Sequence, residues 1–250
     1  MKKTLSLLAA LMVAGVATTP VQAATHYVSA FGGISWMQDM DATNDYQNSA
    51  PNTDYSAKVE LGSGVALTGA VGCDYGHYRL EAEVGYQKND IKSAIDYYGG
   101  IPEPYVNNAD GGESTVYPMR GDVSVLSLMG NAYYDFDLGS KVELYATAGI
   151  GVAQVSFKNV NDTGTWNYVA PGYEFEADND PGYSVHATTL AWQVGAGISA
   201  PIADNVKVDL RYRYFATADF TLDDSANYFS DADNMSLSSH SVLLGLRVDF

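Results

Sequence analysis

The sequence predicts an all-β fold, an eight-stranded antiparallel up-and-down transmembrane β-barrel with four long extracellular loops and short periplasmic turns. Three observations lead to this prediction. Apolar residues alternate with polar or small ones, short and long connections alternate along the chain, and no segment of comparable length has a helical apolar period. Alternation of period two predicts strands with two unlike faces, and a barrel buries or covers both faces.

The first 23 residues differ in character from the rest. Lys2 and Lys3 precede an apolar run, and small residues come directly before Ala24. This pattern is typical of a secretory signal peptide, and the run is shorter than the roughly 20 apolar residues that a membrane-spanning helix needs. We therefore expect residues 1–23 to be removed and residues 24–250 to form one outer-membrane barrel domain.

Eight segments carry the alternating pattern. They span residues 26–36, 62–74, 77–92, 122–137, 141–158, 187–202, 205–217 and 237–250. Short connections with hairpin residues lie around Gly76, Gly139 and Asp204. The long connections cover residues 37–61, 93–121, 159–186 and 218–236. Because successive strands run in opposite directions, the long loops must share one end of the barrel, and the short turns and both termini the other.

The residue types on the polar face indicate which face looks inward. In segment 187–202 that face carries Thr189, Gln193 and Ser199 rather than charges. A face in bulk water would carry charges at roughly 25–35 % of positions. Small neutral residues fit the crowded interior of an eight-stranded barrel, so the apolar face contacts lipid. The alternative, a soluble ligand-carrying barrel that is apolar inside, does not explain this composition.

Aromatic residues at outward positions predict two interfacial girdles. Tyr78 and Tyr86 are eight residues apart, which at about 3.3 Å per residue and a tilt of about 40° gives roughly 20 Å, close to the roughly 25 Å apolar band. The predicted periplasmic girdle and terminal-strand anchors are Tyr78, Tyr134, Phe136, Leu246, Val248 and Phe250, and the outer girdle comprises Trp36, Tyr86 and Tyr214. Lipid cannot satisfy open strand edges, so the last strand is expected to pair with the first.

Charged residues at inward positions predict a salt-bridge network in the lumen. Its predicted members are Arg79, Glu81, Glu83, Asp135, Glu143, Lys207, Asp209, Arg211, Arg213, Arg247 and Asp249. Charges in a narrow interior of low dielectric are costly unless they are paired, which explains why both signs occur. The alternative is a narrow channel for small solutes or ions whose selectivity these residues set.

Three segments resemble the opacity-type family of small outer-membrane barrels. They are LSLMGNAYYDFDLGSKVELYATAGIGVAQVSF at 126–157, YRLEAEVGYQKND at 78–90 and VDLRYRYF at 208–215. The alternating apolar end at Phe250 also resembles the signal by which such barrels are recognised for assembly. The resemblance covers the strands and not the loops. It implies a bacterial outer-membrane surface protein with a role in adhesion, antigenic display or envelope integrity, and outer-membrane lipid, lipopolysaccharide and the barrel assembly machinery as partners.

The charge of the chain limits its other partners. The net charge is −17, and removing Lys2 and Lys3 lowers it by two to −19. So acidic a chain is not expected to bind nucleic acid by counterion release. Most of the negative charge falls in the four long loops, where a host or surface ligand is the expected partner. No acidic cluster has the spacing of an EF-hand, and we expect no metal site and no cofactor.

Three further features carry weaker hypotheses. Arg120-Gly121-Asp122, a tripeptide that integrins recognise, is expected at the end of the second long loop. His240 and Ser241 suggest a lipid-modifying barrel enzyme, but period two places their side chains on opposite faces, where they cannot act as base and nucleophile. We therefore expect no enzymatic activity. Cys73, the single cysteine, is expected to face lipid.

Overall fold

The computed structural model describes residues 24–44, 55–98, 114–139, 141–162, 183–221 and 235–250. The predicted signal peptide and the middle of each predicted long loop lie outside these residues. The strands are β1 (Thr25–Met37), β2 (Met40–Asn44), β3 (Tyr55–Asp74), β4 (Tyr78–Tyr98), β5 (Ser114–Phe136), β6 (Glu143–Asp162), β7 (Tyr183–Ala203), β8 (Val206–Thr217) and β9 (Ser238–Asp249). No helix among these residues is long and apolar enough to cross a membrane.

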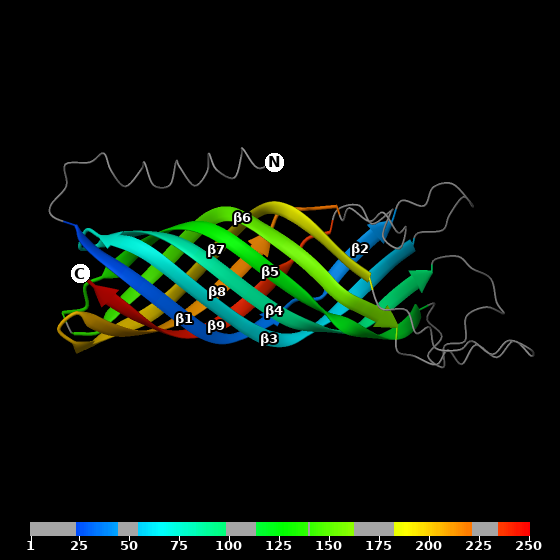
Figure 1. Ribbon diagram of the computed structural model, residues 1–250, viewed down its shortest axis with the longest axis horizontal. Helices are drawn as coiled ribbons and strands as arrows, with labels where there is room; N and C mark the ends of the chain where they lie inside the picture. The colour runs from blue at the N-terminus through cyan, green and yellow to red at the C-terminus, as the bar shows by residue number, and fades with distance from the viewer. Residues whose placement is uncertain (1–23, 45–54, 99–113, 140, 163–182, 222–234) are drawn as a thin grey trace, which may run out of the picture.

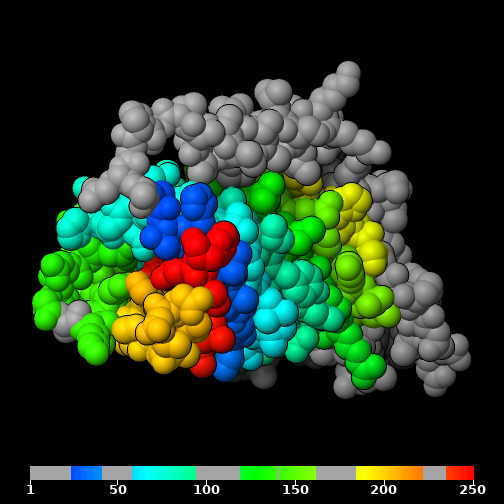
Figure 2. Space-filling model, turned by 60° about the vertical axis from the view of Figure 1, so that its left-hand side comes forward, coloured from blue at the N-terminus to red at the C-terminus, as the bar shows by residue number. Residues whose placement is uncertain are grey.

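The strands close into an antiparallel barrel (Figure 1). β9 pairs with β1 from Tyr27↔Asp249 to Met37↔Ser239, and β1 pairs with β3 on its other edge. Figure 2 shows β9, in red, lying between β1 and β8. The short strand β2 follows β1 after two residues and pairs with the first part of β3. Because β1 pairs with the second part of β3, β1 and β2 together occupy one strand position of the barrel. The prediction of a closed eight-stranded barrel is confirmed.

The two ends of the barrel differ, as the connection lengths predict. The start of β1, the C-terminus and the connections β3–β4, β5–β6 and β7–β8 lie at one end, here called the turn end (Figure 1). Two of these turns hold a glycine with positive φ, Gly76 at 94° and Gly139 at 65°. The carboxylates of Asp74 and Asp137 accept hydrogen bonds from these glycines' N–H groups, at 2.8 Å each. The opposite end is called the loop end.

Strands β3 to β7 run further toward the loop end than predicted. They are 20 to 23 residues long, whereas β1, β8 and β9 have 12 or 13. Register shifts occur between Asp90 and Ser93 and between Arg120 and Asp122. A bulge of this kind interrupts the alternation of side chains, which is why the predicted strand segments stop near these positions. The predicted loop boundaries at 93–121 were therefore wrong.

The Arg120-Gly121-Asp122 tripeptide consequently lies within β5 and not in a loop. Gly121 has φ 142°, and the Asp122 carboxylate is 3.3 Å from the Lys88 ammonium on β4. The tripeptide forms part of the barrel wall, and its carboxylate already has a cationic partner.

Side chains alternate between lumen and exterior along the strands. Outward apolar residues are the most exposed large side chains in the wall, for example Ile150 at 69 % and Leu244 at 60 %, while their neighbours Gly151 and Leu243 are buried. The apolar face therefore looks out, as expected for contact with lipid.

Candidate functional site in the barrel interior

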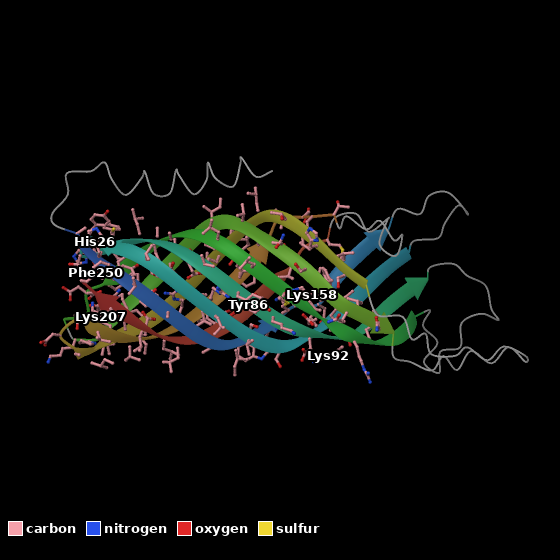
Figure 3. The ribbon with its side chains drawn as sticks, in the orientation of Figure 1. His26, Tyr86, Lys92, Lys158, Lys207 and Phe250 are labelled. Carbon is pink, nitrogen blue, oxygen red and sulfur yellow. The ribbon has the colours of Figure 1, made fainter. Side chains whose placement is uncertain are left out.

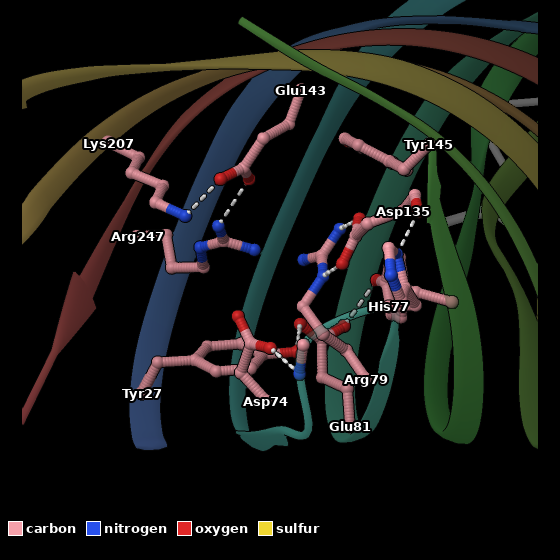
Figure 4. Close-up of polar contacts among 12 residues, drawn as sticks. Tyr27, Asp74, His77, Arg79, Glu81, Asp135, Glu143, Tyr145, Lys207 and Arg247 are labelled. Carbon is pink, nitrogen blue, oxygen red and sulfur yellow. Dashed lines mark hydrogen bonds and ion pairs between the residues drawn. The ribbon is translucent and has the colours of Figure 1, made fainter. Parts of the chain in front are cut away.

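The lumen near the turn end holds a set of paired charges, among them the bidentate Arg79–Asp135 pair (Figure 4). Arg79 on β4 donates from Nε and Nη2 to the two carboxylate oxygens of Asp135 on β5, at 2.7 and 2.8 Å. Its guanidinium carbon lies 4.4 Å from the centre of the Tyr133 ring and 4.9 Å from that of Tyr145. A bidentate, stacked arginine of this kind is held in one geometry.

Glu143 forms a second centre, at the rim of the turn end (Figure 4). Its carboxylate accepts from Lys207 Nζ at 2.6 Å and from Arg247 Nη2 at 2.9 Å. Arg247 Nε also lies 3.8 Å from Asp249 Oδ1. This group joins β6, β8 and β9, and the Glu143 side chain is a third exposed.

Glu83 forms a third centre deeper in the lumen. Its side chain is fully buried, and it accepts from Arg211 Nη1 at 3.1 Å and from Gln193 Nε2 at 3.2 Å, with Arg213 Nη1 at 3.7 Å. The Arg211 guanidinium also lies 4.0 Å from the centre of the Phe31 ring. These contacts connect β4 with β7 and β8 across the interior.

Glu81 and Asp209 do not have the cationic partners that the sequence predicts. Glu81 accepts hydrogen bonds from neutral donors: Tyr27 and Tyr133 hydroxyls at 3.2 and 2.6 Å, Ser29 Oγ at 3.3 Å and Asn131 Nδ2 at 3.2 Å. Asp209 accepts from the Tyr145 hydroxyl. Arg79, the cation nearest to Glu81 in the sequence, pairs with Asp135. The inward tyrosines Tyr27 and Tyr133 donate hydrogen bonds to Glu81 in its place.

Small residues opposite the inward tyrosines make room for them. A Cβ at Gly197 would lie 2.3 Å from the Tyr145 hydroxyl oxygen, and one at Gly72 would lie 2.4 Å from the Tyr27 ring. Each glycine is the cross-strand partner of its tyrosine. Prediction from sequence identified the inward face as small but missed these tyrosines, although their odd-numbered positions place them there.

We call this set of inward residues the polar layer. Its members are Tyr27, Arg79, Glu81, Glu83, Asn131, Tyr133, Asp135, Glu143, Tyr145, Gln193, Lys207, Asp209, Arg211, Arg213, Arg247 and Asp249.

The lumen toward the loop end holds a cluster of buried apolar side chains beside the buried polar residues Ser35, Gln87, Asn89 and Ser239, and the sequence did not lead us to expect this cluster. We call the apolar residues of this cluster the apolar layer. They are Met37, Met40, Leu61, Ile91, Val123, Val125, Met129, Ala153, Val155, Phe157, Val160, Val185, Ala187, Ala191, Phe215, Phe220, Met235 and Leu237, all buried. Outward of Val123 and Val125 stand Asp122 and Ser124, and Leu126 follows directly, so the sequence pattern did not reveal that Val123 and Val125 point inward.

The two layers meet around Gln87 and Arg213. A narrow cleft lies between them, lined on its inner side by Gly85, Gln87, Val125, Arg213 and Phe215, and it has no room for a water molecule. Arg213 donates to Gln87 Oε1 at 3.3 Å across this junction. A solute moving along the lumen would have to displace these side chains.

The outward aromatic residues lie at the two rims. At the turn end, the Tyr78 and Phe136 rings pack edge-on against Tyr134, with centroids 5.2 and 4.9 Å away. The Phe250 ring stacks on the His26 ring, with centroids 6.2 Å apart, and the backbone N–H of Phe250 donates to the backbone carbonyl of His26. Leu246 is exposed and Val248 half-buried on the same wall.

The outer rim carries Trp36, Tyr86 and Tyr214. Trp36 is 44 % and Tyr86 40 % exposed, and the Tyr214 ring lies 5.3 Å from Trp192 and 5.1 Å from His240. These side chains lie near the loop end of the exposed apolar wall.

His240 and Ser241 lie on opposite faces of β9. His240 Nδ1 is 2.6 Å from the Tyr212 hydroxyl on the outer wall, whereas Ser241 is fully buried in the lumen. Cys73 is free and shares the outward face with its larger cross-strand partners His26 and Leu80, as predicted, but it is only 5 % exposed. Among the described residues no group of three His, Cys, Asp or Glu side chains could hold a metal ion.

These features define a class of protein. A closed antiparallel barrel with an apolar outer wall, aromatic rims and a filled interior is an integral β-barrel of the bacterial outer membrane. The model of the family described as "Outer membrane protein beta-barrel domain" matches residues 6–250, and the chain belongs to this family. It is a surface protein of the outer membrane.

Individual relatives are similar over nearly their full length. A putative adhesin of Rickettsia bellii (strain OSU 85-389) is 25 % identical, covering 96 % of this chain and 98 % of the relative. Outer membrane protein PagN of Salmonella typhimurium is 23 % identical, covering 92 % and 87 %. The crystal structure of Neisserial surface protein A has a TM-score of 0.46 at 18 % identity, covering 92 % of this chain and 100 % of that one.

Proposed function

We propose that this protein acts by binding at the cell surface, as an adhesin-type protein whose barrel is a filled scaffold. The observation that carries the proposal is the filled lumen. Paired charges occupy the turn end, a cluster of apolar side chains lies toward the loop end, and the narrow cleft between Gln87, Val125 and Arg213 has no room for a water molecule. A scaffold of this kind leaves the segments at the loop end as the part that meets other molecules.

The sequence of those segments supports the proposal. Residues 45–54, 99–113, 163–182 and 222–234 are rich in Asp, Glu, Asn and Tyr. Tyrosine and asparagine supply contact area and hydrogen bonds at binding surfaces, and acidic groups favour a ligand of complementary charge. The relative from Rickettsia bellii is named as a putative adhesin, and the relative from Salmonella typhimurium as an outer membrane protein. The expected ligand is a host or surface molecule.

We further propose that the role is not enzymatic. A nucleophile and its base must lie within hydrogen-bonding reach of each other. His240 on the outer wall and Ser241 in the lumen do not meet this condition. Full retention of any observed deacylase activity in His240→Ala would agree with this assignment, and its loss would contradict it.

Exchange of loops tests the binding role. Each of the four segments is replaced by a short Gly-Ser turn, singly and together, and adherence of non-adherent bacteria expressing each variant to host cells is counted. We expect adherence to fall to background when all four are replaced. The control replaces residues 204–205 in a periplasmic turn, and a heat-modifiability gel verifies that every barrel is folded. Unchanged adherence after all four exchanges would refute the proposal.

Recording in a planar bilayer tests the channel alternative. The folded protein is inserted and current is measured at both polarities. We expect no discrete conductance from an inserted barrel. Discrete conductance that changes in Arg211→Ala or Arg247→Ala would replace the scaffold by a channel with a charged filter.

A further inference from the structure

The basic side chains that face outward are confined to one side of the barrel. Of the 13 Lys and Arg residues, Lys2 and Lys3 precede the barrel, Lys141 follows a turn, and five lie in the polar layer. The remaining five are Lys58, Lys88, Lys92, Arg120 and Lys158, and all of them belong to β3, β4, β5 or β6. On the outer rim of β7, β8, β9 and β1 the corresponding positions hold Trp192, Tyr214, His240 and Trp36. The rim therefore has a basic side and an aromatic side.

Strand register brings the basic residues of β4, β5 and β6 together. Asp122 of β5 is the cross-strand partner of both Asp90 and Lys158, and its carboxylate is 3.3 Å from Lys88 Nζ. Lys88 and Lys158 therefore flank Asp122 from the two neighbouring strands.

Lys92 and Arg120 continue this surface toward the loop end. The Lys92 side chain lies over Gly62 of β3, where a Cβ would be 3.3 Å from Lys92 Cε. Arg120 lies two residues beyond Asp122 and is exposed. Figure 3 shows Lys92 and Lys158 further toward the loop end than Tyr86 of the outer girdle. We call Lys88, Lys92, Arg120 and Lys158 the basic patch.

The basic patch has a surplus of positive charge. Asp122 neutralises Lys88, but Lys92, Arg120 and Lys158 make no ion pair with any residue that the structure describes. Asp90 is the other acidic residue in these rows, so the cations exceed the carboxylates by two. In a chain of net charge −17 such a local surplus is unusual, because most exposed surface repels anions.

We propose that the basic patch binds phosphate groups of lipopolysaccharide in the outer leaflet. The patch lies just beyond the aromatic girdle, at the depth where lipid headgroups begin. Long basic side chains there extend toward the interface, and each contributes about 1 kcal/mol of attraction to anionic lipid, which is about fivefold in affinity. The aromatic side of the rim lacks these cations, so lipopolysaccharide binds β4 to β6 in preference to β7 to β1. This inference does not depend on the loops or on adhesion.

Binding of purified lipopolysaccharide to the folded full-length protein in detergent tests the proposal. The dissociation constant of fluorescent lipopolysaccharide is measured for wild type, Lys158→Gln, the triple variant Lys92→Gln/Arg120→Gln/Lys158→Gln, and the matched control Lys141→Gln at the other end of the barrel. We expect Lys158→Gln to weaken binding about fivefold and the triple variant more than about twentyfold. Lys141→Gln should change it less than about twofold.

Two further probes identify the group that is bound. Lipopolysaccharide from which the phosphates have been removed should bind wild type and triple variant equally weakly, and inorganic phosphate at millimolar concentration should not displace the intact lipid. Equal binding of intact lipid by wild type and triple variant would overturn the proposal, as would an equal loss in Lys141→Gln. A triple-variant loss that persists with the dephosphorylated lipid, or full displacement by inorganic phosphate, would overturn the assignment to lipid phosphate. A heat-modifiability gel shows that each variant is folded.

Discussion

The two layers of the lumen fill the same barrel by different physical means. In the polar layer charges have directed partners on other strands, such as Glu83 on β4 and Arg211 on β8, 128 residues apart. In the apolar layer side chains such as Met129 and Phe157 pack without directed contacts. Ion pairs and hydrogen bonds require particular partners at particular positions, whereas apolar packing requires mainly volume. The polar layer therefore contributes more to which strands face one another, and the apolar layer to closing the lumen.

The difference also bears on passage through the barrel. A polar lumen alone could conduct if its ion pairs rearranged. The apolar layer lies between the polar layer and the loop end, and an ion would lose much of its hydration among these side chains, with no group of opposite charge in that layer. Each layer can be weakened separately, which gives three predictions, and a fourth concerns the periplasmic girdle outside them.

The largest effect is expected for Glu83→Ala. This change leaves Arg211 and Arg213 in the lumen without their shared carboxylate. Loss of one partner of a buried ion pair costs about 3–5 kcal/mol of unfolding free energy. Guanidinium unfolding in lipid vesicles, followed by tryptophan fluorescence, measures it. The control is Lys207→Ala, which leaves the third-exposed Glu143 carboxylate paired with Arg247 and should cost less.

A rescue variant shows what the charges contribute. Glu83→Leu combined with Arg211→Met and Arg213→Met removes both signs at once, and packed apolar groups often replace a buried ion pair without loss. We expect most of the lost stability to return. If this triple variant is as unstable as Glu83→Ala, the ion pairs of the polar layer contribute stability that packed apolar side chains do not replace.

The next effect is expected for Met129→Ala in the apolar layer. Met129 is fully buried, and truncation of such a side chain costs about 2–5 kcal/mol through lost transfer energy and the cavity that remains. The same unfolding measurement applies, and the outward Leu128→Ala, half-buried on the same strand, is the matched control. A cost below about 1 kcal/mol would show that the apolar layer is loosely packed.

Particular residues show how far the sequence could predict these layers. Period two and residue type predicted that Arg79, Asp135 and Arg211 point into the lumen, where all three are buried. The prediction is possible because a charged side chain that faces lipid destabilises the barrel. The same reasoning could not assign partners, since Glu81 takes hydroxyl and amide donors from two other strands, β1 and β5. Partner choice depends on register across the barrel, which alternation within one strand does not contain.

The apolar layer was missed for a related reason. Val125 and Leu126 are adjacent and both apolar, yet one is 3 % and the other 50 % exposed. Where both faces of a strand are apolar, the residue types do not distinguish inside from outside. Near Arg120 and Asp122 the register shift removed the alternation as well.

A smaller effect is expected for Arg211→Lys, which keeps the charge and changes the geometry. Arg211 donates Nη1 to Glu83 and Nε to the Tyr145 hydroxyl at 3.3 Å, and it stacks on Phe31. A lysine ammonium reaches Glu83 but does not also stack and bond to Tyr145. We expect a loss of about 1.5–3 kcal/mol in unfolding free energy. Lys207→Arg at the partly exposed rim is the control and should be nearly neutral; equal effects would mean that charge alone matters.

The smallest effect is expected for Tyr134→Leu in the periplasmic girdle, outside both layers. Tyr134 faces outward and packs edge-on against Tyr78 and Phe136. Loss of such ring pairs costs about 0.5–1.5 kcal/mol beyond the area that they bury. Because Tyr134 shares no contact with Glu83, the double variant with Glu83→Ala should lose the sum of the two single losses within about 0.5 kcal/mol. A larger departure from additivity would mean that the lumen layers and the lipid-facing wall are coupled through the strand, and that the polar layer also determines how the barrel meets the membrane.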